Sequence, residues 1–504
     1  MGRPDASGQL TYEAVGGQPS TNYLIALGRG EAMPIDVRSD SPLGGGPTGR
    51  AWRTATVQRC LHYGTDPAMA AWREQALAMG VVSSVAVPLC PLPATPSAVL
   101  TIYSPYAGGL QSEDQQAFVD QLKNLLDLAL ARLAPPRPGT ALLPFFVRQR
   151  WRALIDTDAL QLHYQPVVRL RDGRVTELEA LARLRDSDGQ LLMPGRFLPA
   201  LGDDDLVGLF RQVLLQATAE RERLAQLGHP LDMSVNAPAE ALQDPRYAEA
   251  AAAVLAAGTC RAESLLFEIL ESPLGMEHDA PEAMAGMRAL KALGVRLVED
   301  DLGAGYSSLI RLRQWPFDRV KIDQAIVMQA VDDPLRTLRF IRQLIRLGHD
   351  LDLEVVVEGL ETLGLSEAAL LLGADMGQGY ALARPMPAES LPDWLCDVHH
   401  GWTATVPSTA LGALAGALLW EEHLHALPLD SAFWRQHADA ACAAGRYLDR
   451  SVLPLPQLRE AHEAMHAAAL AGPHDAGYRQ ARERFLSLLI EQVGIEEGRR
   501  AAAA

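Results

Sequence analysis

Cysteine is scarce in this chain, and long apolar runs are absent. The 504 residues include five scattered cysteines, and an odd, unclustered set indicates reduced thiols rather than a disulfide framework. No apolar run approaches the length of a membrane span, and the first residues, MGRPDASGQL, lack the apolar core of a signal peptide. We therefore expect a cytoplasmic protein that does not contact a membrane.

Clusters of basic residues are also missing. The chain has 45 Lys and Arg against 62 Asp and Glu, which gives a formal net charge of −17. Such a charge repels nucleic acid unless a local basic patch is present, so no nucleic-acid partner is expected. An anionic substrate would need another source of positive charge, and a bound divalent metal would supply it.

Changes in composition divide the chain into three segments. The stretch ARLAPPRPGTALL contains three prolines and a glycine, which predicts a linker at 135–144. Before it, apolar residues at helical spacing predict a helix over 113–133. Near residue 400 the chain changes to an Ala- and Leu-rich tail that we expect to be all helix. The expected domains are 1–134, 145–400 and 405–504.

The middle segment alternates short apolar stretches with helical patterns, which predicts strand–helix units. Its length of about 260 residues suits one (β/α)8 barrel. The eight candidate strands are LHYQPVV, ELEALAR, LDMSVNA, LLFEIL, VRLVEDD, RVKID, EVVVEGL and GQGYALA. The expected fold class is multidomain α/β, with a central TIM-like barrel, an N-terminal α+β domain and a C-terminal all-α bundle.

Each candidate strand carries a polar residue at or near its end, and the ends of parallel barrel strands converge on one face. These residues are Gln165, Glu179, Asn236, Glu268, Asp300 with Asp301, Lys321 with Asp323, Glu358 and Gln378. Carboxylate and amide oxygens suit hard divalent cations such as Mg²⁺ and Mn²⁺. Two ions bridged by Asp300 fit the acidic count, and two-metal sites promote in-line phosphoryl displacement.

Lys321 could hydrogen-bond the attacking water, and Arg183 could contact a phosphate bidentately. Each of these residues also has an ordinary structural explanation. A carboxylate at a strand end is usually solvated or paired with a surface lysine, and Asn236 and Gln378 could be turn or loop amides. The metal interpretation depends on the repetition of the pattern at nearly every strand end.

The motifs of the middle segment resemble those of EAL-domain cyclic di-GMP phosphodiesterases. The triplet Glu179-Ala180-Leu181 is followed, in family order, by SVNA, FEILES, EDDLGAGYSSL, VKID, VEGLET and GQGYALARPMP. The resemblance implies cleavage of cyclic di-GMP to linear pGpG with Mg²⁺ or Mn²⁺. It also implies a barrel whose first strand runs antiparallel.

The resemblance assigns a role to each matching residue. It implies that the metal ligands are Glu179, Asn236, Glu268, Asp300, Asp301 and Glu358. Lys321 would position the water with support from Asp323, and Glu271 would anchor the loop after the paired aspartates. The substrate site would be lined by Gln165, Leu181, Arg183 and Gln378.

The sequence departs from the family pattern beside these ligands. Leu302 and Ala304 replace the usual Phe and Thr of the loop, Leu270 replaces a Thr, and Leu201-Gly202 replaces an Ala-Glu pair. No ligand is lost, so an active phosphodiesterase is expected. A weakly active or inactive cyclic di-GMP receptor is the alternative, and a scaffold that does not bind the nucleotide is a third. No cyclase motif is present, so no synthesis of the nucleotide is expected.

The first segment resembles a GAF sensory domain in the stretches GPTGRAWRTATVQRC, DPAMAAWREQALAMGVVSSVAVPL and AVLTIYS. The resemblance implies a regulatory role. Two interpretations stay open, a cavity for an unknown small-molecule ligand and a packed dimerisation platform. A homodimer is expected from the family resemblance.

The tail offers a candidate zinc site. His462 and His466 are four residues apart and so share one helix face. With Cys442 and either His423 or His425 they could complete a tetrahedral zinc site. This set weakly resembles the chemoreceptor zinc-binding domain, whereas histidines on an Ala-rich helix are more often simply exposed.

Overall fold

The computed structural model describes residues 1–504 except 6, 91–95, 133–142, 144, 259, 271–279, 304–308, 399–405, 428–431, 441, 452–454, 473 and 502–504. The contacts divide the chain into two compact units. One unit comprises Met1–Ala159 and Asp186–Gly202, and the other comprises Leu160–Arg185 and Asp203–Ala504. The expected linker at 135–144 lies outside the described residues except for Leu143.

The first unit contains a five-stranded antiparallel sheet in the order β2-β1-β5-β4-β3. Its strands are β1 (Gly2–Pro4), β2 (Leu10–Tyr12), β3 (Gln58–Cys60), β4 (Ser83–Leu89) and β5 (Ala98–Ser104). Its helices include α1 (Gln18–Gly28), α2 (Pro47–Thr54), α3 (Arg73–Ala78), α4 (Glu113–Arg132), α5 (Phe145–Leu154) and α6 (Pro194–Phe197). Helix α4 confirms the helix expected over 113–133.

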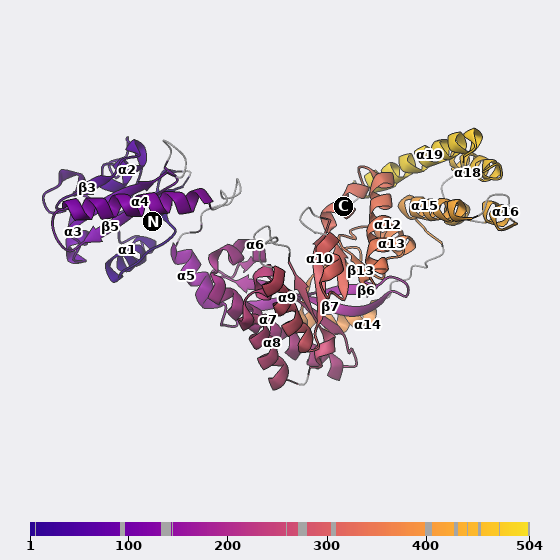
Figure 1. The fold of residues 1–504 in the computed structure, drawn as a ribbon, viewed down its shortest axis with the longest axis horizontal. Coiled ribbons are helices and arrows are strands. Elements are labelled where there is room, and N and C mark those ends of the chain that lie inside the picture. The colour runs from indigo at the N-terminus through magenta and orange to yellow at the C-terminus, as the bar shows by residue number, and fades with distance from the viewer. Residues whose placement is uncertain are drawn as a thin grey trace. The chain divides into compact units, whose positions relative to one another are not determined.

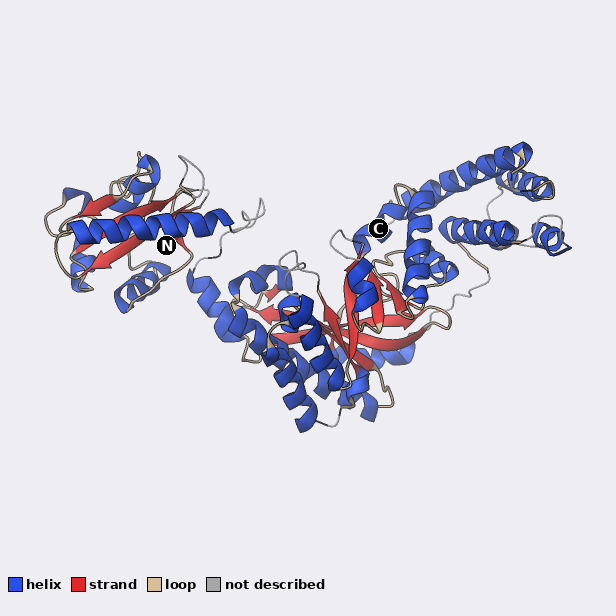
Figure 2. Cartoon of the chain, in the orientation of Figure 1, coloured by secondary structure: helices blue, strands red, loops and turns tan. Residues whose placement is uncertain are grey.

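Alternation along β4 gives this sheet two apolar faces. Val85, Val87 and Leu89 pack with Val119 of α4 on one face, as the two-residue period of a strand requires. Ala86 points to the other face, where it packs with Ala51 of α2. Figure 2 shows α4 lying across the sheet.

The second unit contains a closed ring of eight strands in the order β6-β7-β9-β10-β11-β12-β13-β14, with β14 returning to β6. The strands are β6 (Leu160–Arg169), β7 (Arg174–Arg185), β9 (Asp232–Ala237), β10 (Leu265–Ile269), β11 (Arg296–Leu302), β12 (Arg319–Ile322), β13 (Glu354–Val357) and β14 (Met376–Gly377). The first seven coincide with expected strands, and β14 overlaps the eighth only at Gly377. Strand β6 runs antiparallel to both of its neighbours, as the family resemblance implies, and the other junctions are parallel.

The prediction for the eighth strand was wrong, because the strand ends earlier than expected. GQGYALA was expected to be a strand, but the ladder ends at Gly377. The chain then turns, because the Leu382 amide donates to the Gly379 carbonyl and the Ala381 amide to the Leu360 carbonyl. A further short strand, β15 (Met386–Pro387), pairs antiparallel with β6.

Helices cover the outside of the barrel (Figure 1). They are α7 (Asp203–Gln226), α8 (Pro245–Ala257), α9 (Ala280–Ala292), α10 (Leu309–Gln314), α11 (Gln324–Val327), α12 (Pro334–Asp350), α13 (Leu363–Leu372) and α14 (Leu391–Asp397). Helix α12 shows why they pack there. Leu338, Ile341 and Ile345 are buried at the i, i+3, i+7 spacing of one helix face.

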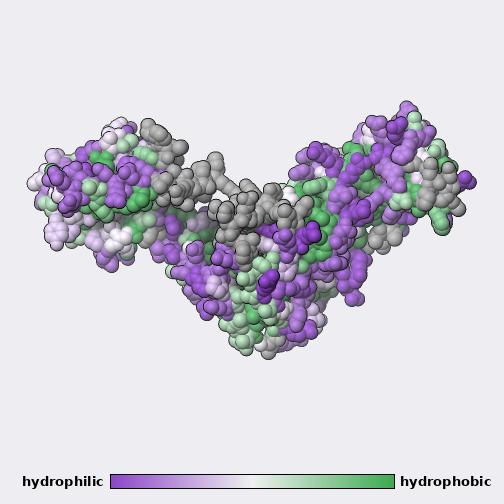
Figure 3. Space-filling model, viewed as in Figure 1, coloured by the Kyte–Doolittle hydropathy of each residue, from purple (hydrophilic) through white to green (hydrophobic). Residues whose placement is uncertain are grey.

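The described elements of the C-terminal part are all helices, as expected. It consists of α15 (Ala410–Ala426), α16 (Ala432–Asp439), α17 (Ala443–Arg450), α18 (Pro456–Ala469) and α19 (Ala476–Ala501). Helix α15 begins against barrel helix α13, because the buried Glu367 carboxylate accepts hydrogen bonds from the Ser408 and Thr409 amides at 3.0 Å. In the described residues no helix combines the length and apolarity needed to cross a bilayer. Hydrophilic residues cover much of the face seen in Figure 3.

Candidate active site and a second cluster of metal-ligand residues

The barrel gathers acidic side chains at the carboxyl ends of its strands. Because β7 and β9 to β13 run parallel, residues near their ends come together at one mouth of the barrel. The residues are Glu179 on β7, Asn236 on β9, Glu268 on β10, Asp300 and Asp301 on β11, Lys321 on β12, and Glu358 and Gln378 just after β13 and β14. The sequence predicted this set, and the fold brings its members into contact.

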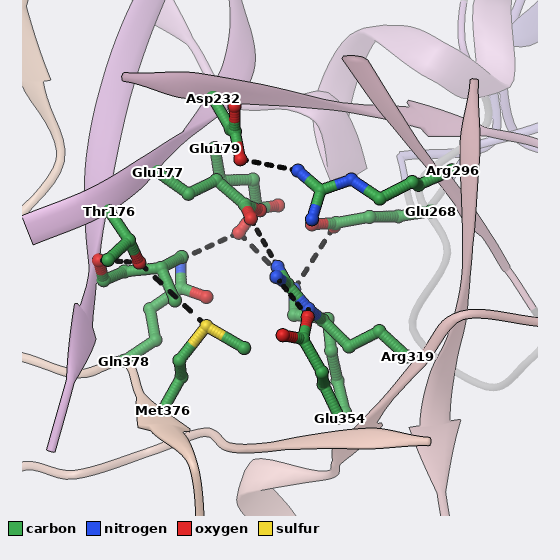
Figure 4. A network of polar contacts seen from close by, with 12 residues as sticks. Thr176, Glu177, Glu179, Asp232, Glu268, Arg296, Arg319, Glu354, Met376 and Gln378 are labelled. Atoms are coloured by element: carbon green, nitrogen blue, oxygen red, sulfur yellow. Dashed lines mark hydrogen bonds and ion pairs between the residues drawn. The ribbon is translucent and has the colours of Figure 1, made fainter. Parts of the chain in front are cut away.

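The carboxylate of Glu179 is held by two amide donors. The Asn236 side-chain amide donates to Glu179 Oε1 at 2.9 Å, and the Gln378 amide donates to Oε2 at 2.7 Å. Figure 4 shows Gln378 directed at Glu179. Both oxygens are therefore fixed in orientation, and the Asn236 amide oxygen is left as a ligand atom.

Lys321 provides the positive charge at the centre of these acids. Its ammonium nitrogen lies 2.5 Å from Glu358, 3.0 Å from Glu268, 3.4 Å from Glu179 and 3.7 Å from Asp300. The side chain is only 3% exposed. Burial alone would lower the pKa of Lys321, but the surrounding carboxylates raise it well above its usual value.

A bulge in β11 places two neighbouring aspartates on the same site. In a regular strand Asp300 and Asp301 would point to opposite faces. Here the pairing with β12 shifts register between Glu299 and Leu302, and Asp301 adopts a φ of 61°. The inserted residue breaks the alternation, so ligand atoms of Asp300, Asp301 and Glu358 all lie within 4.8 Å of one another.

The site holds more negative charge than its one lysine balances. Burial, followed by repulsion from Asp300 and Asp323, raises the pKa of Asp301 to about 7. Burial also raises the pKa of Glu358 to about 7, although Lys321 opposes the shift. The Asp300 Oδ1 atom is buried and has no hydrogen-bond partner in the described residues. An excess of buried carboxylate oxygen with one oxygen unpartnered fits hard divalent cations.

A second group of charged residues lies further along the barrel strands, away from the acidic mouth; Figure 4 shows members of both groups. Glu177 and Arg319 precede Glu179 and Lys321 by two residues on β7 and β12, and they form an ion pair across the barrel. Arg319 also contacts Glu354 at 2.8 Å, and Asp232 pairs with Arg296. This second group was not predicted from the sequence. The i, i+2 spacing on two expected strands was the signal for it, since such residues point to the same side.

The other predicted site residues lie around the mouth. The Gln165 amide donates to the Ala383 carbonyl at 3.1 Å, and the Arg183 guanidinium, 4% exposed, donates to the Ala182 carbonyl at 2.9 Å. Asp323 caps α11 by accepting from the Ala325 amide. Leu181 pairs with His163 on β6.

Several of the residues that depart from the family pattern border the barrel strands and helices. Leu302 is 2% exposed and pairs with Ile322, so it fills the barrel wall beside the bulge. Leu270 directly follows β10, and Leu201 and Gly202 directly precede α7. Glu271 and Ala304 lie outside the described residues.

A second cluster forms among the C-terminal helices. Cys442, at the N-cap of α17, has its Sγ 3.0 Å from His462 Nε2 and 3.4 Å from His466 Nε2 of α18. These three ligand atoms lie within 4.8 Å of one another. His423 is not in this group; it is exposed on α15, and its ring faces that of His437 at a centroid distance of 6.0 Å.

The imidazole ring of His466 is oriented as that of a metal ligand would be. Its Nδ1 lies 2.7 Å from the Ala438 carbonyl oxygen, which can only accept, so Nδ1 carries the proton and Nε2 presents its lone pair to the cluster. Backbone contacts of this type orient metal-binding histidines. Burial, helped by His466, lowers the pKa of His462 to about 4, so its ring is neutral.

Comparison with known proteins shows what the barrel is similar to. Residues 148–385 match the EAL domain. Cyclic di-GMP phosphodiesterase RocR of Pseudomonas aeruginosa is 34% identical over 241 residues, which are 48% of this chain and 61% of RocR. Cyclic di-GMP phosphodiesterase NbdA of the same organism is 32% identical over 251 residues, 49% of this chain and 32% of NbdA.

A solved structure gives the same match. The MucR phosphodiesterase in complex with cyclic di-GMP is 31% identical, and the aligned region covers 48% of this chain and 98% of that one, with a TM-score of 0.45. The match thus covers less than two thirds of RocR and NbdA, and it falls on the barrel. Residues 148–385 of this chain thus match the EAL domain, and the similar proteins include cyclic di-GMP phosphodiesterases.

Proposed function

We propose that the barrel hydrolyses one phosphodiester bond of cyclic di-GMP to give linear pGpG, under regulation by the N-terminal domain. The observation that carries the proposal is the acidic mouth of the barrel. Asp300, Asp301 and Glu358 bring ligand atoms within 4.8 Å of one another, and Asp300 has a buried oxygen without a hydrogen-bond partner among the described residues, 3.7 Å from the Lys321 ammonium. Relatives with matching barrels are named cyclic di-GMP phosphodiesterases.

Two divalent ions, Mg²⁺ or Mn²⁺, would be held by Glu179, Asn236, Glu268, Asp300, Asp301 and Glu358. Divalent ions supply charge neutralisation for the phosphodiester and a lower pKa for the attacking water. The donor set supports this choice, because every ligand atom is a hard oxygen.

The protein's own residues would orient the reactants. The amides of Asn236 and Gln378 already fix both oxygens of Glu179, so little reorganisation is needed on binding. Lys321 would hold the attacking water or a phosphoryl oxygen by charge-assisted hydrogen bonds. Arg183 is largely buried, and a phosphate would be a stronger acceptor for its guanidinium than the backbone carbonyl of Ala182.

The alternative is a receptor that binds cyclic di-GMP without cleaving it. The feature that favours it is the departure from the family pattern after β11, where Leu302 and Ala304 replace the usual Phe and Thr. The loop therefore lacks the threonine hydroxyl. This alternative keeps every ligand residue and differs only in turnover.

The test is turnover of cyclic di-GMP by the full chain in Mg²⁺ and in Mn²⁺, with pGpG measured by chromatography. Glu179→Gln keeps the shape of the side chain and removes its charge, and it should lower turnover by at least ~100-fold, the upper end of the cost of losing a residue that orients a metal ligand. Glu354→Gln is the matched control, because Glu354 belongs to the second charged group and is 54% exposed. It should leave turnover unchanged.

Three results would decide between the candidates. Turnover that depends on Glu179 supports the phosphodiesterase. Tight binding of cyclic di-GMP with no turnover in either metal supports the receptor. Absence of binding in isothermal titration refutes both.

We also propose that the C-terminal cluster binds Zn²⁺ through Cys442, His462 and His466. One thiolate and two neutral imidazoles are ligands that zinc prefers, and the contact of His466 with Ala438 supports it by fixing the ring. A water, or a fourth side chain, would complete a tetrahedral site. The role of such a site would be to join α17 to α18.

Metal analysis of the purified chain tests this second proposal. The wild type should hold about one zinc per chain, as expected for a structural site, and Cys442→Ser should lose it. His423→Ala, on the exposed face of α15, should retain it. If His423→Ala loses the zinc to the same extent as Cys442→Ser, a ligand set without His423 is wrong.

A further inference from the structure

The first unit encloses a cavity on the face of its sheet opposite α4. The volume is about 590 Å³, and the lining comes from β1, β2, β5, α1 and the turn around Met69 and Trp72. Ligand sites for small molecules usually measure about 300–1,000 Å³. The cavity is therefore large enough for a molecule of two or more fused rings.

The lining of the cavity is mainly apolar and aromatic. Among the described residues, no Asp, Glu, Lys, Arg or His side chain lines the cavity, although such residues are common in the rest of the chain. The one charged group on a lining residue is the N-terminal ammonium of Met1, which donates to the Ala14 carbonyl at 2.7 Å. Aliphatic and Met side chains line it together with five aromatic rings: Tyr12, Tyr23, Tyr63, Trp72 and Tyr103. A charged ligand would lose its hydration here and find no charged side chain in the described lining, and the Met1 ammonium already has a backbone partner. The lining therefore favours a neutral ligand over an anion such as a nucleotide.

Most of the polar groups in this lining already have partners. The Tyr23 hydroxyl donates to the Met33 carbonyl at 2.6 Å, and the Trp72 indole donates to the same oxygen at 3.1 Å. The Tyr63 hydroxyl donates to Ser84 Oγ at 3.2 Å. These contacts fix three of the rings in place.

Tyr12 differs from these residues. Its hydroxyl is shielded from solvent and has no hydrogen-bond partner among the described residues. Burial raises the pKa of Tyr12 well above its usual value, so the hydroxyl is neutral and can both donate and accept. A polar group left without a partner favours a ligand that provides one.

We infer that this cavity binds a neutral, ring-containing small molecule with one hydrogen-bonding group that pairs with the Tyr12 hydroxyl. Aromatic walls select planar rings through stacking and edge-to-face contacts. The buried, unpartnered hydroxyl of Tyr12 sets where the polar group of the ligand lies. Binding of this kind does not depend on the chemistry of the barrel.

Three probes that share one ring system test the charge and the hydrogen bond separately. They are 2-naphthol, naphthalene and 2-naphthoate, added to the full chain at neutral pH, with binding followed by isothermal titration and by tryptophan fluorescence. We expect 2-naphthol to bind at least tenfold more tightly than the anionic 2-naphthoate. Naphthalene should bind between the two, because it fills the cavity without using Tyr12.

The variant Tyr12→Phe removes only the hydroxyl. It should reduce the affinity for 2-naphthol to that for naphthalene and leave naphthalene binding unchanged. Tyr106→Phe is the matched control, because Tyr106 is 78% exposed and does not line the cavity. It should change nothing.

Each contrary outcome overturns the inference. Failure of all three probes to bind, or equal binding of 2-naphthoate and 2-naphthol, refutes the ligand class. Equal loss of naphthalene and 2-naphthol binding in Tyr12→Phe refutes the role of the hydroxyl.

Discussion

The cross-barrel pair between Glu177 and Arg319 makes a prediction about stability. Glu177 is 2% exposed and Arg319 is 5% exposed, so each is the main compensation for the other's buried charge. Glu354, the second partner of Arg319, is 54% exposed and keeps its hydration when the arginine is removed. The variant Arg319→Met therefore leaves one uncompensated charge in the barrel, on Glu177.

The expected cost follows from this geometry. Removal of one partner of a buried pair costs about 3–5 kcal/mol, whereas replacement of both by apolar residues of similar volume is close to neutral. We expect Arg319→Met to lower the free energy of unfolding of the barrel by about 3–5 kcal/mol. The double variant Glu177→Leu/Arg319→Met should recover most of that loss.

Hydrogen exchange of β7 and β12, measured by mass spectrometry, reports the opening of this part of the barrel and does not require the whole chain to unfold in one step. The loss corresponds to roughly 10²- to 4 × 10³-fold faster exchange, because each 1.4 kcal/mol is tenfold. Arg169→Met is the matched control. Arg169 pairs with Asp172 at the surface, with exposures of 30% and 35%, and such pairs are worth about 0–1 kcal/mol.

Two results would refute the reasoning. If Arg319→Met accelerates exchange no more than Arg169→Met does, Glu177 is not held as a buried charge. If the double variant is as unstable as Arg319→Met, the loss comes from packing of the arginine stem and not from the charge left behind.

Other predictions concern the site and the C-terminal helices. A Cβ at Gly379 would overlap the backbone of Leu360. Gly379→Ala should therefore displace the neighbouring Gln378 and lower cyclic di-GMP turnover by roughly 100-fold. Gly208 has open space around it, so Gly208→Ala should leave turnover unchanged. Without added metal, Lys321→Met should lower the free energy of unfolding of the barrel by about 3–5 kcal/mol. Lys291 pairs with Asp318, and both side chains are 31% exposed, so Lys291→Met should cost less than about 1 kcal/mol. Equal melting temperatures of the two variants would contradict this prediction. Glu367→Ala should destabilise α15 by about 2–3 kcal/mol through lost bonds to a charged acceptor, seen as faster amide exchange there, and the exposed Glu361→Ala should have no effect on that helix.

The sequence by itself determined the strand–helix order and most of the site. Apolar stretches of four to eight residues, each with a polar residue near its end, located all eight barrel strands. The motif order then indicated the family and the antiparallel β6. These features are local, because each depends on residues within one strand and the turn after it.

Only the tertiary structure decided how neighbouring carboxylates share one site. Asp300 and Asp301 would diverge in any regular strand, and it is the bulge and the φ of 61° at Asp301 that turn both toward Glu358. Likewise, the sequence grouped Cys442, His462 and His466 with either His423 or His425. The fold brings the first three together and leaves His423 outside the group. The partnership of Glu177 with Arg319 also needed the closed ring, since 142 residues separate them. Contacts across a barrel depend on strand register and closure, which local periodicity does not specify.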